Sequence, residues 1–209
     1  MEQYEELAER LAKAVRAQLF IEVEASGRHV HLSREAVDVL FGPGHELTWA
    51  RDLSQPGQFA CQERVTVTGP KGSLTKVAVL GPERSESQVE LSMTDALALG
   101  IKAPVRQSGQ IRGSAPIVIS TDRGALELSE GAIVAARHIH MTPEDARRYG
   151  LKDKDMVSVK VFGKRPVVFD HTMLRVSDAF QTRMHIDYDE ANACGYTPGT
   201  LAMIMKDRG

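Results

Sequence analysis

Two short His-x-His segments have the residue types and spacing most suited to chemistry in this chain. They contain His29 and His31, and His138 and His140, which are four of the seven histidines among 209 residues. Residues two positions apart on a β-strand point to the same face, so each segment would present two imidazoles together. Imidazole is a ligand for zinc, copper, iron or nickel. We therefore expect each segment to begin a metal site; the alternative is two ordinary surface or core histidines.

An internal repeat relates the two segments and makes coincidence a poor explanation. Arg28–Ala36 matches Arg137–Asp145 almost position for position, and Val89–Gly100 aligns with Met184–Gly195 in the same order. The first half carries additional residues between its two motifs, around Leu53–Gln58. A repeat of this kind indicates two similar structural units.

The repeat also supplies a third ligand for each predicted site. Glu90 and His185 occupy equivalent positions, and each lies in an alternating segment where it should point opposite its apolar neighbours. The alternatives are a solvated carboxylate at Glu90 and a polar core residue at His185. The predicted ligand sets are His29, His31 and Glu90, and His138, His140 and His185. Three protein ligands with an open position are typical of catalytic zinc rather than structural zinc.

Two further features favour an anion near these sites. Thr142–Asp145 has a capping hydroxyl, a proline at the first helical position and acidic residues in the first turn, which predicts a helix start; Ser33–Glu35 is a weaker version. Helix N-termini attract phosphate, although capping alone also explains the pattern. Arg84, six residues before Glu90, could hold phosphate through its planar guanidinium, or be a solvated surface residue.

The elements that must position these residues are mostly short strands with a few brief helices. Residues 2–20 follow helical spacing with an apolar stripe, and we expect this stripe to pack on its own barrel as a structural cap rather than to act as a targeting peptide. The alternating segments that follow, with a hairpin turn at Gly69–Gly72, predict barrels or sandwiches. We divide the chain into an N-terminal helix at 1–20 and two halves at 21–115 and 116–209, which share strands and the active site.

Composition excludes several classes of partner. The chain is 42% hydrophobic and 26% charged, with a formal net charge of -2, so we expect neither a nucleic acid nor a membrane partner. Cys61 and Cys194 lie far apart in the sequence, which disfavours a disulfide or a thiolate zinc site and favours the reducing cytoplasm.

Six motifs together resemble the PduL-type phosphotransacylases, also called phosphate propanoyltransferases. The motifs are Arg28–Ser33, Leu53–Phe59, Leu80–Arg84, Gln88–Glu90, Arg137–Met141, and Met184–Asp187 followed by Asp189–Asn192. The resemblance implies a mainly β fold of two pseudo-symmetric six-stranded barrels capped by short helices. It implies an enzyme with two zinc ions per chain in a dinuclear site, which exchanges a propanoyl or acetyl group between coenzyme A and phosphate.

The same resemblance implies roles for individual residues. The site of His29, His31 and Glu90 would take the sulfur of CoA, and the site of His138, His140 and His185 would take water or phosphate. Arg84 would be the catalytic, phosphate-holding arginine, and Asn192 is a further candidate. Arg51 stands where a lysine is usual and Ala78 where an arginine is common, which leaves substrate detail open.

Relatives in this family imply a homodimer and work in bacterial microcompartments that degrade propanediol, with shell or cargo proteins as partners. The competing hypothesis is a two-domain cupin, either a metal-dependent oxygenase or a sugar-binding module, with Glu35 and Glu144 as further ligands. A cupin glutamate belongs on a strand, however, and Pro143 places Glu144 in the first turn of a helix.

Overall fold

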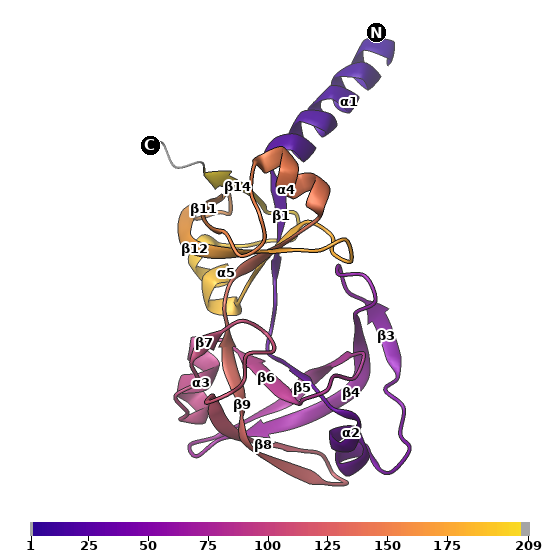
Figure 1. Ribbon diagram of the computed structural model, residues 1–209, viewed down its shortest axis with the longest axis vertical. Coiled ribbons are helices and arrows are strands. Elements are labelled where there is room, and N and C mark those ends of the chain that lie inside the picture. The colour runs from indigo at the N-terminus through magenta and orange to yellow at the C-terminus, as the bar shows by residue number, and fades with distance from the viewer. Residues whose placement is uncertain (1, 206–209) are drawn as a thin grey trace. The chain divides into compact units, whose positions relative to one another are not determined.

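The computed structural model describes residues 2–205, except for the side chains of residues 2, 3, 13, 14 and 17. Its chain forms two compact units (Figure 1). The Glu90 barrel comprises Ser26–Arg137 and Ile186–Asp189, and the His185 barrel comprises the described residues of Met1–Ala25, His138–His185 and Glu190–Gly209. The predicted mainly β fold of two six-stranded barrels with short helices is confirmed.

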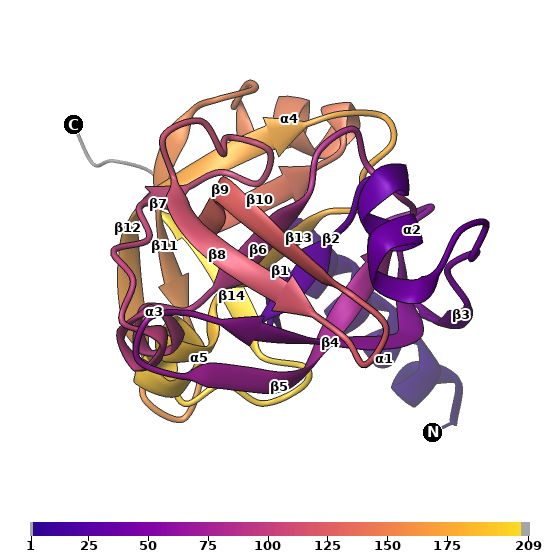
Figure 2. The ribbon, with the colours of Figure 1, turned by 90° about the horizontal axis from the view of Figure 1, so that it is seen from below.

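The Glu90 barrel is closed by six strands, with two more attached at its side. Its elements are β2 (His29–His31), α2 (Arg34–Phe41), β3 (Trp49–Asp52), β4 (Phe59–Thr68), β5 (Ser73–Gly81), β6 (Gln88–Leu91), α3 (Met93–Leu99), β7 (Val105–Arg106), β8 (Ala115–Ser120) and β9 (Ala125–Ala135). The strands pair in the ring β4-β5-β2-β6-β9-β8, and β8 returns to β4. Strand β3 pairs with β4, and β7 pairs with β9. Figure 2 shows β8 and β9 as the antiparallel hairpin of this ring.

The His185 barrel repeats this plan. Its elements are α1 (Glu2–Leu19), β1 (Ile21–Ala25), β10 (His138–Met141), α4 (Pro143–Tyr149), β11 (Met156–Val161), β12 (Val167–Val176), β13 (Arg183–Ile186), α5 (Tyr188–Cys194) and β14 (Leu201–Met205). Its closed ring is β1-β13-β10-β12-β11-β14. The end of β13 and the start of α5 group with the other unit.

The His-x-His strand holds the same place in both rings. Strand β2 is parallel to β5 and antiparallel to β6, and β10 is parallel to β12 and antiparallel to β13. In each case the preceding strand belongs to the other unit: β1, before β2, closes the His185 barrel, and β9, before β10, closes the Glu90 barrel. The sequence repeat is therefore a repeat of strand order and pairing.

Alternation along the strands builds the core of the Glu90 barrel. Val30, Val79 and Val89 are fully buried on neighbouring strands β2, β5 and β6. Helix α2 covers part of this core with Val37 and Leu40, and Thr121 donates a 2.5 Å hydrogen bond to the Leu40 carbonyl. The scaffold under β2 is thus rigid and apolar, which fixes the side chains on its other face.

Helix α1 forms where the periodicity predicts it, but its apolar stripe is exposed. The exposed fractions are Tyr4 79%, Leu7 51%, Leu11 58%, Val15 52% and Leu19 49%; Ala8 is also exposed, and the side chain of Ala14 lies outside the described residues. The hypothesis that this stripe packs on its own barrel as a cap is therefore wrong. Periodicity identifies which face of a helix is apolar, but it does not identify what covers that face.

The two predicted helix starts are confirmed as capped N-termini. Ser33 accepts a hydrogen bond from the Ala36 amide at 3.2 Å, and Thr142 accepts one from the Asp145 amide at 3.1 Å, with Pro143 in the first turn of α4. Among the described helices, none has the length and apolarity that a bilayer span requires.

Candidate metal clusters and their surroundings

Strands β2 and β6 bring the first predicted ligand set together. His29 lies opposite Glu90 and His31 opposite Gln88 in this antiparallel pair, while Val30 lies opposite Val89. Cross-strand partners point to the same face, so the imidazoles and the carboxylate share one face and the valines the other. We call His29, His31 and Glu90 the Glu90 cluster.

The geometry of the Glu90 cluster suits a metal ion. Nε2 of His29 lies 3.5 Å from Oε2 of Glu90, and Nε2 of His31 lies 3.6 Å from Oε1. All three residues are buried, and one ligand atom from each lies within 4.8 Å of the others. Two imidazoles and one carboxylate match the ligand types of catalytic zinc.

Neighbouring groups orient these three side chains. Nδ1 of His29 lies 2.8 Å from the Gly27 carbonyl, which fixes a hydrogen on Nδ1 and leaves the Nε2 lone pair for a metal. Nε2 of Gln88 donates a 2.5 Å hydrogen bond to Oε1 of Glu90. Within the described residues, Nδ1 of His31 is buried without a hydrogen-bond partner. A buried polar atom without a partner is costly, and a metal ion bound at this nitrogen would remove that cost.

Electrostatics in the Glu90 cluster favour a cation. Burial alone would raise the pKa of Glu90, but the charge of His29 and hydrogen bonds from both histidines hold it well below its usual range. Burial lowers the pKa of His31 to about 4, against the opposing effect of Glu90. Burial also opposes a charged His29, but the attraction of Glu90 raises its pKa. A buried carboxylate that attracts positive charge is a ligand that a divalent metal ion can use in place of a proton.

Strands β10 and β13 bring the second predicted set together in the same register. His138 lies opposite His185, and the three rings of the His185 cluster (His138, His140 and His185) have centroids 4.7, 4.9 and 5.2 Å apart. Nδ1 of His140 is buried without a partner in the described structure, as Nδ1 of His31 is. Burial, then the charges of the other two histidines and of Arg175, lower the pKa of His140 to about 2. Neutral imidazoles are the metal-binding form.

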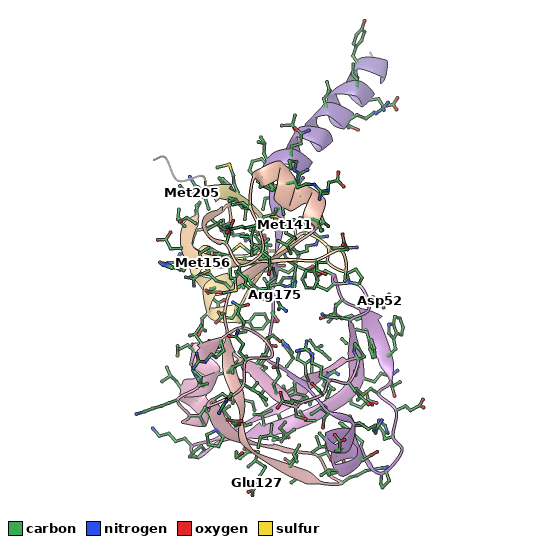
Figure 3. All side chains as sticks on the ribbon, viewed as in Figure 1. Asp52, Glu127, Met141, Met156, Arg175 and Met205 are labelled. Carbon is green, nitrogen blue, oxygen red and sulfur yellow. The ribbon has the colours of Figure 1, made fainter. Side chains whose placement is uncertain are left out.

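The two clusters differ in compactness and in charge. Among the described residues, the Glu90 cluster is the one group of three whose ligand atoms all lie within 4.8 Å of one another. The His185 cluster has no carboxylate of its own; Oε2 of Glu24, on β1, lies 3.8 Å from Nδ1 of His185. Arg175, labelled in Figure 3, lies on β12 opposite His140. The three residues of the second cluster therefore carry no negative charge of their own, whereas those of the first include the Glu90 carboxylate.

Arg84 lies beside the His-x-His segment of the Glu90 barrel. Its amide donates to the Leu32 carbonyl at 2.9 Å, and its Nη1 donates to Oγ of Ser108 at 2.9 Å. Its charge is among the influences that lower the pKa values of His29 and His31. The guanidinium thus adds positive charge near the Glu90 cluster.

Other residues singled out in the sequence lie outside the clusters. Asn192 is an exposed residue of α5, and Arg51 is an exposed residue of β3. Ala78, on β5, is the register partner of His29. Glu35 and Glu144 lie in the first turns of α2 and α4, not on strands, as the argument against a cupin requires.

Sequence reasoning missed Gln88 and Ser108, although one of them left a signal. Gln88 lies two residues before Glu90 on β6 and opposite His31, so strand alternation alone puts it on the ligand face. Ser108 lies in the loop between β7 and β8, where no periodicity marks it.

Comparison with known proteins identifies the family of this chain. Residues 22–197 match the family model described as phosphate propanoyltransferase. The chain is 60% identical over 201 residues to the phosphate propanoyltransferase of Clostridioides difficile (strain 630), with 96% of each chain covered. It is 56% identical over 203 residues to that of Enterococcus faecalis (strain ATCC 700802 / V583), again with 96% of each covered. With a match over most of its length and with relatives this similar, the chain belongs to the phosphate propanoyltransferase family.

Proposed function

We propose that the chain transfers a short acyl group, propanoyl or acetyl, between coenzyme A and inorganic phosphate. The observation that carries this proposal is the buried Glu90 cluster, three residues that could hold a metal ion, in a chain that belongs to the phosphate propanoyltransferase family. In the forward reaction, acyl-CoA and hydrogen phosphate give acyl phosphate and CoA.

The bond changes define what the site must do. A phosphate oxygen forms a bond to the thioester carbonyl carbon, the carbon–sulfur bond breaks, and its electron pair stays on sulfur. The hydrogen of hydrogen phosphate ends on sulfur, which balances the reaction. Two groups therefore need stabilisation, the leaving sulfur and the approaching phosphate, and holding both reactants in place removes much of the cost of bringing them together.

We assign the sulfur to the Glu90 cluster and phosphate to the His185 cluster, with one zinc ion held by each. Zinc, when bound, supplies Lewis acidity that stabilises an anionic sulfur or phosphate oxygen. His29, His31 and Glu90 hold the first ion, and the Gly27 carbonyl and Gln88 keep His29 and Glu90 oriented toward it. His138, His140 and His185 hold the second. Arg84 binds phosphate oxygens through its planar donors.

An assay of CoA release tests this function. Purified protein is supplied with propanoyl-CoA or acetyl-CoA, and released CoA thiol is measured with and without phosphate. We expect release that requires phosphate and that stops when metal is removed by a chelator. Release independent of phosphate, or none in zinc-loaded protein, would refute the proposal. A cupin oxygenase or sugar-binding module predicts no phosphate-dependent release.

The exposed stripe of α1 supports a further part of the proposal, that this helix contacts a partner protein rather than its own barrel. We assign it to a shell or cargo protein of a bacterial microcompartment, and the catalytic unit to a homodimer. A fusion of residues 1–20 to a fluorescent protein should concentrate in microcompartments, and sedimentation of the whole chain should give the dimer mass. A diffuse fusion or a monomer mass would contradict the respective assignment.

A further inference from the structure

A continuous chain of hydrogen bonds links the metal-ligand candidate Glu90 to Arg84. Nε2 of Gln88 donates to Oε1 of Glu90 at 2.5 Å and to Oγ of Ser108 at 2.7 Å. Nη1 of Arg84 donates to the same Ser108 oxygen at 2.9 Å. All four residues belong to the Glu90 barrel.

The amide of Gln88 can take only one orientation in this chain. Its side chain is almost fully buried at 2% exposure, its two hydrogens go to Glu90 and Ser108, and its oxygen accepts from the Gly109 amide at 2.8 Å. A flipped amide would place its oxygen against the Glu90 carboxylate and its hydrogens against the Gly109 amide. Gln88 is therefore a fixed connector between the ligand strand and the loop that carries Ser108.

Ser108 receives both bonds on one hydroxyl. A hydroxyl oxygen has two acceptor positions, and Arg84 and Gln88 occupy both. The loop is a turn closed by a 3.0 Å bond from the Gln110 amide to the Gln107 carbonyl, and it passes through Gly109 at a φ of +91°. This φ is one that glycine adopts readily. The backbone N–H of Gly109 donates to the side-chain oxygen of Gln88, while Ser108, the preceding residue, accepts from the side-chain nitrogen of Gln88. The turn is therefore fixed to the Gln88 amide at two neighbouring points, which holds Ser108 in place.

We propose that Ser108 is a positioning residue, which holds the guanidinium of Arg84 at a fixed place relative to the Glu90 carboxylate through Gln88. The inference rests on the proposed function for the role of Arg84, but its connection to the metal site can be tested without turnover. An arginine side chain has many rotamers, so a partly buried acceptor that selects one of them prepares Arg84 for phosphate before phosphate arrives.

Ser108→Ala and Ser108→Thr form the central comparison. The alanine variant leaves two donors without their acceptor, and we expect the phosphate KM to rise about 10-fold with the acyl-CoA KM within about 2-fold. Threonine keeps the hydroxyl and should restore the phosphate KM to within about 3-fold of the original. Gln110→Ala changes a side chain in the same loop that takes no part in this series of hydrogen bonds, and it should leave both KM values unchanged.

A double-mutant cycle separates positioning from general loop damage. If Ser108 acts through Arg84, Ser108→Ala in an Arg84→Lys background should raise the phosphate KM by less than about 2-fold further. An equal rise in both backgrounds, or an unchanged phosphate KM in Ser108→Ala of an active enzyme, would overturn the proposal. Melting temperatures of the variants within a few degrees of the unsubstituted protein exclude misfolding as the cause.

The hydrogen bonds also connect Ser108 to Glu90, so zinc affinity gives a test that needs no enzymatic activity. Zinc affinity is measured on metal-free protein by competition with a chromophoric chelator. Gln88→Met keeps the bulk but not the amide, and it should weaken one zinc site about 10- to 100-fold, as loss of an orienting hydrogen bond does. Ser108→Ala should weaken the same site by a smaller factor, because it acts through Gln88. Unchanged zinc affinity in both variants overturns the inference, whether or not the protein turns over acyl-CoA.

Discussion

Replacement of Glu90 by glutamine tests the Glu90 cluster with the smallest change in shape. The amide oxygen can still accept the hydrogen bond from Gln88, so the substitution removes the negative charge and leaves the contact. In the native chain the carboxylate oxygens of Glu90 lie 3.5 and 3.6 Å from the Nε2 atoms of His29 and His31, and Glu90 is only 7% exposed. A metal ion there would lose its one anionic protein ligand.

The expected loss of zinc affinity follows from this geometry. Substitution of groups that merely orient a ligand costs about 10- to 100-fold in metal affinity, so loss of the ligand charge should cost at least about 100-fold. That factor corresponds to about 2.7 kcal/mol of binding free energy. At a zinc concentration about 100 times the native Kd, the ion would stabilise the native protein by about 2.7 kcal/mol, and the variant by about 0.4 kcal/mol.

Chelator competition on metal-free protein measures both the number of sites and their affinities. We expect two tight zinc sites per chain in the native protein, and in Glu90→Gln one unchanged site and one weakened site. Glu127→Gln, at an exposed position of β9 (Figure 3), is the matched control and should keep both sites. If Glu90→Gln retains two sites within about 3-fold of the native affinity, Glu90 is not a metal ligand.

Three further predictions concern turnover and stability. His29→Ala and His138→Ala should each lower the phosphate-dependent rate at least about 100-fold, while His45→Ala and His171→Ala should retain activity; near-native rates in both of the first variants would exclude the clusters from catalysis. Arg84→Lys keeps the charge but not the planar donor pair, so the phosphate KM should rise more than the acyl-CoA KM, and an unchanged phosphate KM would remove Arg84 from this role. Deletion of residues 1–19 should shift the melting temperature by less than about 4 °C, because the five large side chains of the α1 stripe are 49–79% exposed and their loss uncovers little apolar surface, while a shift of 4 °C corresponds to about 1–2 kcal/mol in a chain of this size; a much larger fall would show that the stripe is covered in solution.

The grouping of three residues in each cluster could be predicted because the sequence contains the same arrangement twice. Alternation places His29 with His31 on one face, but it cannot show that β2 pairs with β6, since strand pairing between distant segments leaves no local pattern. The repeat supplied that information: Glu90 and His185 stand at equivalent places, and both prove to be register partners of the first histidine.

Other parts of the fold carry no such signal. Strands β3 and β7 are short and exposed, and β9 is interrupted by Gly131 and charged residues, so none of them shows a clean alternation. The exchange of β1 and β9 between the two barrels depends on ring closure, which is a property of the whole set of strands. Ser108 needs the folded loop before it meets Arg84 and Gln88.

The one cluster residue that differs between the two repeats, Glu90 in the first and His185 in the second, gives the clusters different electrostatic characters. If each holds a zinc ion, the Glu90 cluster retains about one positive charge and the His185 cluster about two, because histidine ligands are neutral. Glu24 reduces this difference only in part, since it lies 3.8 Å from His185 and its side chain is 36% exposed, against 8% for Glu90. Arg175, opposite His140, adds positive charge on the same side.

A phosphate dianion is stabilised more by the greater charge, whereas a thiolate carries a single charge and must also be released. The Glu90-for-His185 difference therefore favours phosphate at the His185 cluster and sulfur at the Glu90 cluster. An exchange of ligands tests this reasoning: His185→Glu should weaken phosphate binding more than it weakens CoA binding, and the opposite order would refute it.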